Sequence, residues 1–234
     1  MKVIYSDISN ERFSNLKKYI DFLSPNRKDK INCFKFEKDK IRSIFSELLL
    51  NYALKIFYNI DLKDCKIHFN IYGKPYIDHE FDLKYNLSHS GDIVICSIST
   101  NNIGVDIEEN ISLNLDTVIN CLHTVEREEL DNCKTEERIK LFYDYWVLKE
   151  SYLKYLGIGL QYPVEKLGFN INNEQINVIS DLETEKNTFF KLLNISDYYS
   201  AAVCCENSEE IELEMIEPDI LKKHFENGKI SLLD

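Results

Sequence analysis

Two acidic residues, Asp106 and Glu108, flank Ile107 within a run typical of a β-strand. Alternate residues of a strand point to one face, so both carboxylates face one way while Ile107 faces a core. Two carboxylates on one face suit Mg²⁺, which usually takes one or two protein carboxylates together with substrate phosphates. Because the same spacing is common on solvent-facing strands, it indicates a metal site only if a further segment meets it.

A second segment, residues 142–160, can supply further charged groups. On a helix, Trp146, Glu150 and Lys154 fall at i, i+4 and i+8 and therefore share a face. The rest of the segment is largely apolar, and Gly157 is placed to end the helix. An ordinary core helix with a Glu–Lys pair is the alternative interpretation.

Two further stretches favour an anionic ligand. The turn Asn86-Leu87-Ser88-His89-Ser90-Gly91 offers hydrogen-bond donors at a strand end. Between Lys17 and Arg42, basic residues outnumber acidic ones nine to four, in a chain of net charge −12. Such a chain is a poor general binder of nucleic acid but a reasonable binder of a small anion, although lysines on helices are often merely solvated. Nucleophilic Ser–His catalysis is disfavoured because adjacent strand residues diverge and no G-x-S-x-G motif is present.

The sequence patterns around these groups predict an α+β fold. Helical periodicity predicts long helices over about 37–58 and 135–156, and alternation predicts strands over 85–88, 93–99 and 103–108 as one β-meander. Each half thus has a long helix packed on a small, mostly antiparallel sheet. We expect two similar halves related by a pseudo-two-fold, residues 1–108 and 109–234, with the ligand site near their boundary.

Composition limits the alternatives. The 234 residues are 44% hydrophobic, and no apolar run is long enough to span a membrane. The first residues lack a signal-peptide core, and the seven cysteines show no CxxC spacing, which favours reduced thiols and a cytoplasmic location. Two similar halves would make a monomer sufficient.

Four ordered motifs together resemble those of the 4′-phosphopantetheinyl transferases. They are Gly73-Lys74-Pro75, then Asn86-Leu87-Ser88-His89-Ser90-Gly91, then Gly104-Val105-Asp106-Ile107-Glu108, and finally Phe142-x3-Trp146-x2-Lys149-Glu150-Ser151-x2-Lys154-x2-Gly157-x-Gly159-Leu160. The likeness spans about residues 20–205 and is greatest to the larger, pseudo-dimeric branch of the surfactin-synthetase-activating type.

The resemblance implies a role for each matching residue. It implies that Mg²⁺ is bound by Asp106, Glu108 and Glu150. It implies that the coenzyme A 3′-phosphate meets Arg27, Lys30, Arg42 and His89, and that the coenzyme pocket is lined by Lys74, Pro75 and Ser88. Catalysis would fall to Glu150 as base and Lys154 as neutraliser of the pyrophosphate, with Glu126 as an alternative base.

The implied reaction moves phosphopantetheine from coenzyme A to a serine of an acyl or peptidyl carrier protein and releases 3′,5′-ADP. Two other functions stay open: a Mg²⁺-dependent nucleotide phosphohydrolase, and an inactive adaptor that binds carrier proteins. The apolar residues within 111–122 could form a carrier groove, but core packing is the simpler explanation.

Overall fold

The computed structural model describes residues 1–78, 82–172, 175–180, 188–207 and 210–230, and its elements repeat one order twice. The first half contains β1 (Lys2–Asp7), α1 (Phe13–Ile20), α2 (Pro25–Cys33), α3 (Glu37–Tyr58), β2 (Lys66–Phe69), β3 (Pro75–Asp78), β4 (Lys84–Ser90) and β5 (Ile93–Ser99). The second contains β6 (Ile103–Glu109), α4 (Leu115–Val118), α5 (Thr124–Asn132), α6 (Arg138–Leu156), β7 (Gly168–Asn172), β8 (Gln175–Ile179), β9 (Phe189–Leu192) and β10 (Tyr199–Cys205). A tail adds β11 (Glu212–Met215) and α7 (Pro218–Ile230).

The two halves also pair their strands in the same way. The first sheet contains the order β1-β5-β4 and the second the order β6-β10-β9, with every one of these neighbours antiparallel. In each half, a long helix, α3 or α6, packs on this sheet. The expected α+β fold of two similar halves is therefore confirmed.

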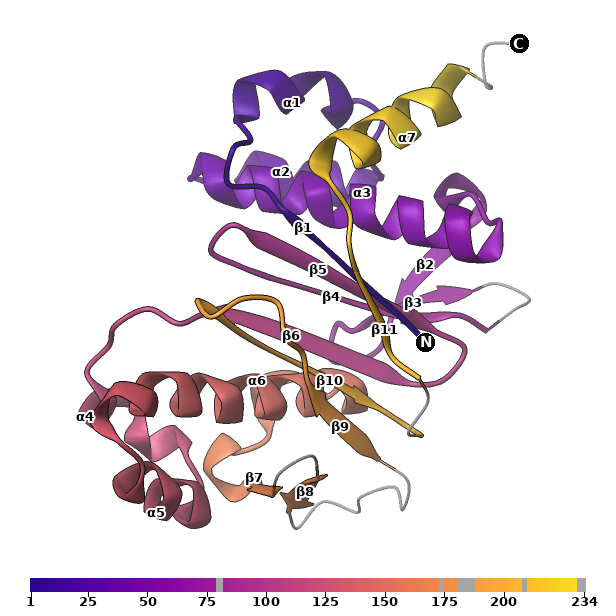
Figure 1. The fold of residues 1–234 in the computed structure, drawn as a ribbon. Coiled ribbons are helices and arrows are strands. Elements are labelled where there is room, and N and C mark those ends of the chain that lie inside the picture. Colours follow the sequence, from indigo (N-terminus) through magenta and orange to yellow (C-terminus); the bar gives the residue numbers. More distant parts are fainter. Residues whose placement is uncertain (79–81, 173–174, 181–187, 208–209, 231–234) are drawn as a thin grey trace.

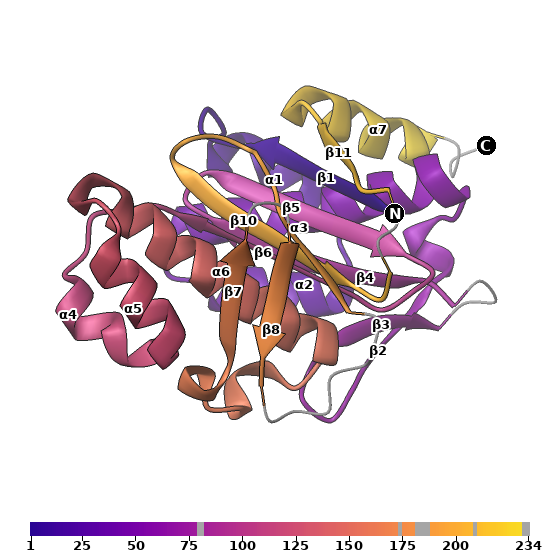
Figure 2. The ribbon, with the colours of Figure 1, turned by 60° about the horizontal axis from the view of Figure 1, so that its bottom comes forward.

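The halves stack as four layers, helix, sheet, sheet and helix (Figure 1). One apolar cluster lies between the first sheet and α1, α3 and α7, and another lies between the second sheet and α6. A third cluster, which includes Ile95, Val105 and Val203, fills the space between the two sheets. The view in Figure 2 shows the same stacking with α6 beneath β6 and β10.

Strand β6 corrects the expected meander. It was expected to continue the β4–β5 hairpin, but it pairs with β10 in the second sheet, with Asp106 opposite Ala202. Its place in the repeat matches that of β1, so the sheets assign it to the second half. The expected boundary at residues 108/109 therefore falls one strand later than the boundary between the two sheets.

The C-terminal tail returns to the first half. Strand β11 pairs in parallel with β1, and α7 packs on α3. The Ser6 hydroxyl donates to the Ile216 carbonyl at 2.7 Å and so fixes the link between β11 and α7. The tail thereby adds a helix to one wall of the first half.

Local signals explain where the long helices end. Helix α3 has the expected bounds, and Asn59 ends it in the left-handed conformation at φ 54°. Helix α6 begins at Arg138 after a 3₁₀ turn at Thr135–Glu137, and Gly157 ends it at φ 70°, as expected. The apolar residues of 113–122 pack on the core beneath α6, which agrees with core packing; Ile111, by contrast, is exposed.

Gly104 allows α6 to lie directly on β6. A Cβ atom at this position would lie 2.0 Å from the Ser151 carbonyl oxygen and 2.4 Å from the Tyr155 nitrogen. Both obstacles are helix backbone, which cannot move aside as a flexible side chain could. Gly104 therefore sets the distance between this strand and this helix.

We expect Gly104→Ala to lower the free energy of unfolding by about 3 kcal/mol, the upper end for overpacking, because α6 must shift. Chemical denaturation measures the change. The control is Gly159→Ala, at a φ of 60° with no atom within 4 Å of the added Cβ, which tests backbone strain alone and should lower it by about 1 kcal/mol. Equal losses for the two variants would contradict the role of the close contact.

Candidate active site

The two acidic residues of β6 face α6, as the strand pattern predicts. Asp106 is almost fully buried and Glu108 is half-buried, whereas Ile107 lies in the core between the sheets. They share this face with Gly104, so the close approach of the helix brings them against it. The predicted orientation of both carboxylates is confirmed.

Lys154 of α6 reaches the buried carboxylate. Its Nζ lies 2.6 Å from Asp106 Oδ1 and donates to Ser88 Oγ at 2.9 Å. The Ser88 hydroxyl in turn donates to Asp106 Oδ1 at 2.7 Å. Helix α6, strand β6 and strand β4 thus meet at one point, although they come from both halves.

Glu150 and Glu108 both have raised pKa values, and nearby carboxylates contribute to each shift. Burial and the neighbouring Asp106 and Glu108 carboxylates raise the pKa of Glu150 to about 7, although Lys154 opposes the shift. The pKa of Glu108 is also raised, chiefly by burial, while hydrogen bonds from the Ser90 and Trp146 side chains lower it. An added cation would relieve the repulsion among these carboxylates.

The donors fit a magnesium ion chemically, but they do not form a closed cage. Within the described ranges, no three His, Cys, Asp or Glu side chains are arranged to hold a metal. Asp106 Oδ2 is buried and has no hydrogen-bond partner among the described residues. Mg²⁺ commonly takes only one or two protein carboxylates and completes its shell with water and substrate phosphates. The oxygen chemistry therefore suits this ion.

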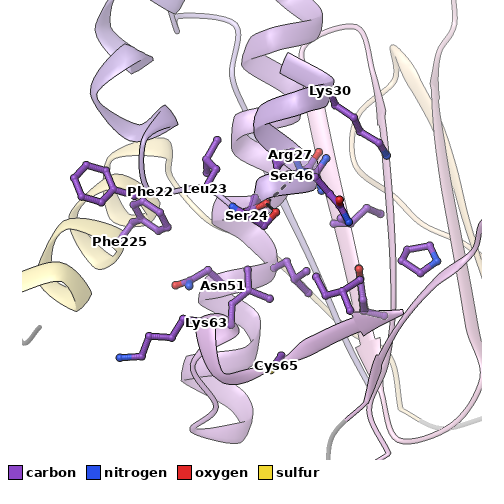
Figure 3. A pocket seen from close by; sticks show the side chains of 18 of the residues that line it. Phe22, Leu23, Ser24, Arg27, Lys30, Ser46, Asn51, Lys63, Cys65 and Phe225 are labelled. Atoms are coloured by element: carbon purple, nitrogen blue, oxygen red, sulfur yellow. Dashed lines mark hydrogen bonds and ion pairs between the residues drawn. The ribbon is translucent and has the colours of Figure 1, made fainter. Parts of the chain in front are cut away.

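Lys154 also lines a cavity of about 1030 Å³. Figure 3 shows other residues of its lining, among them Arg27 and Lys30. Five of the predicted coenzyme-binding residues line the cavity, together with the predicted catalytic residue Lys154: Arg27, Lys30, Pro75, Ser88 and His89. Helices α2 and α3 and strands β2, β3 and β4, all of the first half, contribute most of its lining, and α6 and α7 also contribute. The cavity therefore extends from the basic residues Arg27 and Lys30 to Lys154, which pairs with Asp106.

Cations concentrate in this cavity. Lys30 has a lowered pKa because it is partly buried and lies near Arg27. His89 also has a lowered pKa, through burial first and then through Arg42, Lys154 and Arg27. A neutral imidazole next to cations gains a proton more readily when an anion binds beside it.

Two predicted binding residues do not line the cavity. Arg42 pairs with Asp39 at 2.9 Å and donates through Nε to the Gly91 carbonyl at 2.8 Å, so it holds the β4–β5 turn. Lys74 donates to the carbonyls of Tyr155 at 3.0 Å and Ile103 at 3.2 Å. Both side chains hold the structure around the cavity.

The cavity is also lined by residues that no sequence motif indicated. Glu47 of α3 accepts hydrogen bonds from the Ser24 amide and hydroxyl, both at 2.6 Å, and pairs with Arg27 at 3.4 Å. A lone glutamate on the apolar face of the 37–58 helix was the available signal. Phe225 of α7 and Phe22 line the opposite end, but no pattern in the sequence placed α7 beside α3.

Glu126, the alternative base, forms a buried ion pair in the core of the second half. Its side chain is fully buried and lies 2.8 Å from Lys149 Nζ, which is also fully buried. Glu126 also accepts from the amides of His123 at 2.8 Å and Phe169 at 2.9 Å. Burial raises the pKa of Glu126 and lowers that of Lys149, while their contact opposes both shifts. The pair joins α5, α6 and β7.

We expect Glu126→Ala to lower the free energy of unfolding by about 3–5 kcal/mol, because it leaves the buried Lys149 ammonium without a counter-ion, although the Val164 and Leu167 carbonyls still accept from it. The double variant Glu126→Leu/Lys149→Met should recover much of that loss. Urea denaturation measures both, and Glu128→Ala, an exposed position on the same helix, is the control. A Glu126→Ala protein of normal stability would show that the pair is not structural.

The lowered pKa of Lys74 predicts that the free energy of unfolding rises at alkaline pH. Burial lowers its pKa from 10.5 to about 8, so between these values the unfolded chain binds more protons than the folded chain. Stability should therefore rise by about 1–2 kcal/mol from pH 8 to 10.5, allowing for partial exposure. Denaturation of wild type and Lys74→Met across this range tests it; Lys223→Met, at an exposed position, is the control. Parallel profiles for wild type and Lys74→Met would contradict it.

Two family sequence models match the chain and meet just before β6. The model described as 4′-phosphopantetheinyl transferase, N-terminal, matches residues 10–101. The model described as the 4′-phosphopantetheinyl transferase superfamily matches residues 102–204. The chain therefore belongs to the 4′-phosphopantetheinyl transferase superfamily, in its larger branch with two halves.

Two named relatives agree with this assignment, and a solved structure resembles part of the chain. The chain is 28% identical to the 4′-phosphopantetheinyl transferase Sfp of Bacillus subtilis (strain 168), across 87% of this chain and 88% of that one. It is 31% identical to the 4′-phosphopantetheinyl transferase gsp of Aneurinibacillus migulanus, across 66% of this chain and 64% of the relative. A holo-(acyl-carrier-protein) synthase from Bacillus anthracis str. Ames, solved in complex with CoA, is 23% identical with a TM-score of 0.40, across 46% of this chain and 96% of that chain.

Proposed function

We propose that this chain transfers 4′-phosphopantetheine from coenzyme A to a serine of an acyl or peptidyl carrier protein, with 3′,5′-ADP as the second product. The contact of Lys154 with Asp106 and Ser88 carries the proposal, because it joins a carboxylate cluster to a cationic cavity. A ligand with phosphates along its length matches both parts. Family membership supports the same reaction class.

The coenzyme would lie with its phosphates along the cationic wall. Arg27, Lys30 and His89, which line the cavity, would meet a phosphate monoester, which carries close to two negative charges at neutral pH. Lys154, which pairs with Asp106, would meet the pyrophosphate. Pro75 and Ser88 would contact the rest of the nucleotide, while Arg42 and Lys74 support the walls.

Asp106, Glu108 and Glu150 are the residues that would hold Mg²⁺, which neutralises pyrophosphate charge when it is bound. Lys154 would stabilise the charge that develops on the departing 3′,5′-ADP. The bond formed joins the carrier serine oxygen to the phosphorus that bears the pantetheine arm, and the bond broken joins that phosphorus to the bridging oxygen. Catalysis of this kind depends on positioning and charge neutralisation.

Glu150 is the stronger candidate for the base that accepts the serine proton. Its carboxylate is half-buried beside Asp106 and Glu108. A bound Mg²⁺ would lower its pKa, so its uncoordinated oxygen, or a water that it orients, would accept the proton. Glu126 is fully buried and already accepts from Lys149 and two backbone amides. A proton acceptor must reach the attacking hydroxyl, so the structure favours Glu150 over Glu126.

The proposal includes a carrier-protein domain as partner, action as a monomer in the cytoplasm, and no binding to nucleic acid or membranes. The net charge of −12 opposes nucleic-acid binding. No helix within the described residues is both long and apolar enough to cross a bilayer.

Incubation of the protein with coenzyme A, Mg²⁺ and a panel of apo carrier proteins tests the activity. We expect a carrier mass gain of one phosphopantetheine, detected by intact-protein mass spectrometry, and its loss when a chelator removes the metal. Nucleotide breakdown without modified carrier would instead indicate a phosphohydrolase. Carrier binding without any metal-dependent transfer would indicate an inactive adaptor.

In the same assay, Asp106→Ala and Glu150→Ala should abolish transfer, because each removes an oxygen donor from the proposed metal site. Lys154→Ala should slow transfer by about 10²-fold or more, as expected for loss of one group that stabilises developing charge. Lys223→Ala, at an exposed position on α7, is the control. Normal turnover by Asp106→Ala at ordinary Mg²⁺ concentration would refute the metal assignment.

A further inference from the structure

We propose that Ser90, the last residue of β4, is a positioning residue that holds Glu108 for the metal; this inference rests on the proposed function. The Ser90 hydroxyl donates to Glu108 Oε2 at 2.7 Å, and its oxygen accepts from the Glu109 amide at 3.1 Å. A hydroxyl that donates to a carboxylate and accepts from the adjacent backbone has a fixed direction. The carboxylate is thereby held at one oxygen.

Ser90 belongs to a wider set of contacts between two strands of different sheets. Asn86 Oδ1 accepts from the Val105 amide at 3.0 Å, and the Ser88 hydroxyl donates to Asp106 at 2.7 Å. We call these two contacts and those of Ser90 the β4–β6 seam. Because the three β4 residues alternate along the strand, they face β6 together. The direction of both β6 carboxylates therefore depends on side chains of β4.

Ser90 differs from Ser88 in what it can reach. Ser88 lines the cavity and contacts Lys154, so it would touch the ligand itself. Ser90 is not among the described residues that line the cavity. It acts through Glu108, which the Trp146 side chain also approaches. Glu108 therefore lies between β4, whose Ser90 holds it, and α6.

The turn that follows Ser90 is itself fixed. Arg42 of α3 donates to the Gly91 carbonyl at 2.8 Å, and the Tyr199 hydroxyl accepts from the Asp92 amide at 2.9 Å. Gly91 adopts φ 53°, and a Cβ there would lie 2.5 Å from Glu109 Oε2. Groups from both halves thus anchor the backbone that carries the Ser90 hydroxyl. This contact gives Arg42 a supporting role at the turn.

Removal of this hydroxyl should weaken metal binding selectively. We expect Ser90→Ala to reduce Mg²⁺ affinity about 10-fold, the lower end for loss of a partner that orients a metal ligand. Binding of 3′,5′-ADP without metal should stay unchanged, because Ser90 lies outside the cavity lining. The protein has one tryptophan, Trp146, and it contacts Glu108, so its fluorescence can report Mg²⁺ titrations in saturating 3′,5′-ADP. Calorimetry provides a second measurement.

Matched variants separate positioning from general damage to the sheet. Ser90→Thr keeps the hydroxyl and should restore near-normal affinity, whereas Ser90→Cys keeps the size with only a weak donor and should resemble Ser90→Ala. Ser97→Ala on neighbouring β5 is the control, because the Ser97 hydroxyl has no hydrogen-bond partner among the described residues. Thermal melting checks that each variant folds.

The possible results are distinct. If Ser90→Ala and Ser90→Cys both bind Mg²⁺ as tightly as wild type does, the proposal for Ser90 is overturned. The proposed function is not affected by that result, because wild type still binds Mg²⁺. An equal loss of metal-free 3′,5′-ADP binding would also overturn it, since that indicates a general distortion. If wild type itself binds no Mg²⁺ with 3′,5′-ADP present, the metal assignment of the proposed function fails, and the role of Ser90 fails with it.

Discussion

The close contact between α6 and β6 is the constraint on which the site depends. Gly104 has no side chain, so the backbone of Ser151 and Tyr155 can lie against the strand. At that separation Lys154 reaches Asp106 and the Trp146 side chain reaches Glu108. A larger residue at position 104 would separate these groups while each element kept its own structure. The chemistry is thus set by a packing distance.

Charge is distributed unevenly across the site for a physical reason. Asp106, Glu108 and Glu150 place negative charge together, and Lys154 opposes it. Burial, followed by repulsion from Asp106 and Glu108, raises the pKa of Glu150 to about 7. Lysine, arginine and histidine line the adjoining cavity. A polyanion that shares a divalent cation with the carboxylates would satisfy both regions together. Neither region alone specifies such a ligand, since an isolated carboxylate pair or basic wall has many uses.

Local patterns predicted much of this arrangement. The bounds of α3, the β4–β5 hairpin and the shared face of Asp106 and Glu108 all follow from periodicity, which neighbouring residues decide. Strand β6 pairs with β10, which lies far along the chain. Consecutive strands usually pair, so the sequence suggested β5 as the partner, and this was wrong. Lys74 and Arg42 follow the family motif, yet nearby carbonyls compete for their donors, and only the packed structure shows that competition.

The repeated halves explain why a site forms between them. Strand β4 ends one sheet and β6 ends the other, and side chains of β4 satisfy outward-facing amides of β6 at Val105 and Glu109. Directly paired strands would lie about 4.8 Å apart and would satisfy those amides with backbone carbonyls. Contacts through Asn86 and Ser90 instead let polar side chains fill the junction. Two sheet edges that meet without merging therefore leave Asp106 at the junction, where the cavity residues Ser88 and Lys154 contact it.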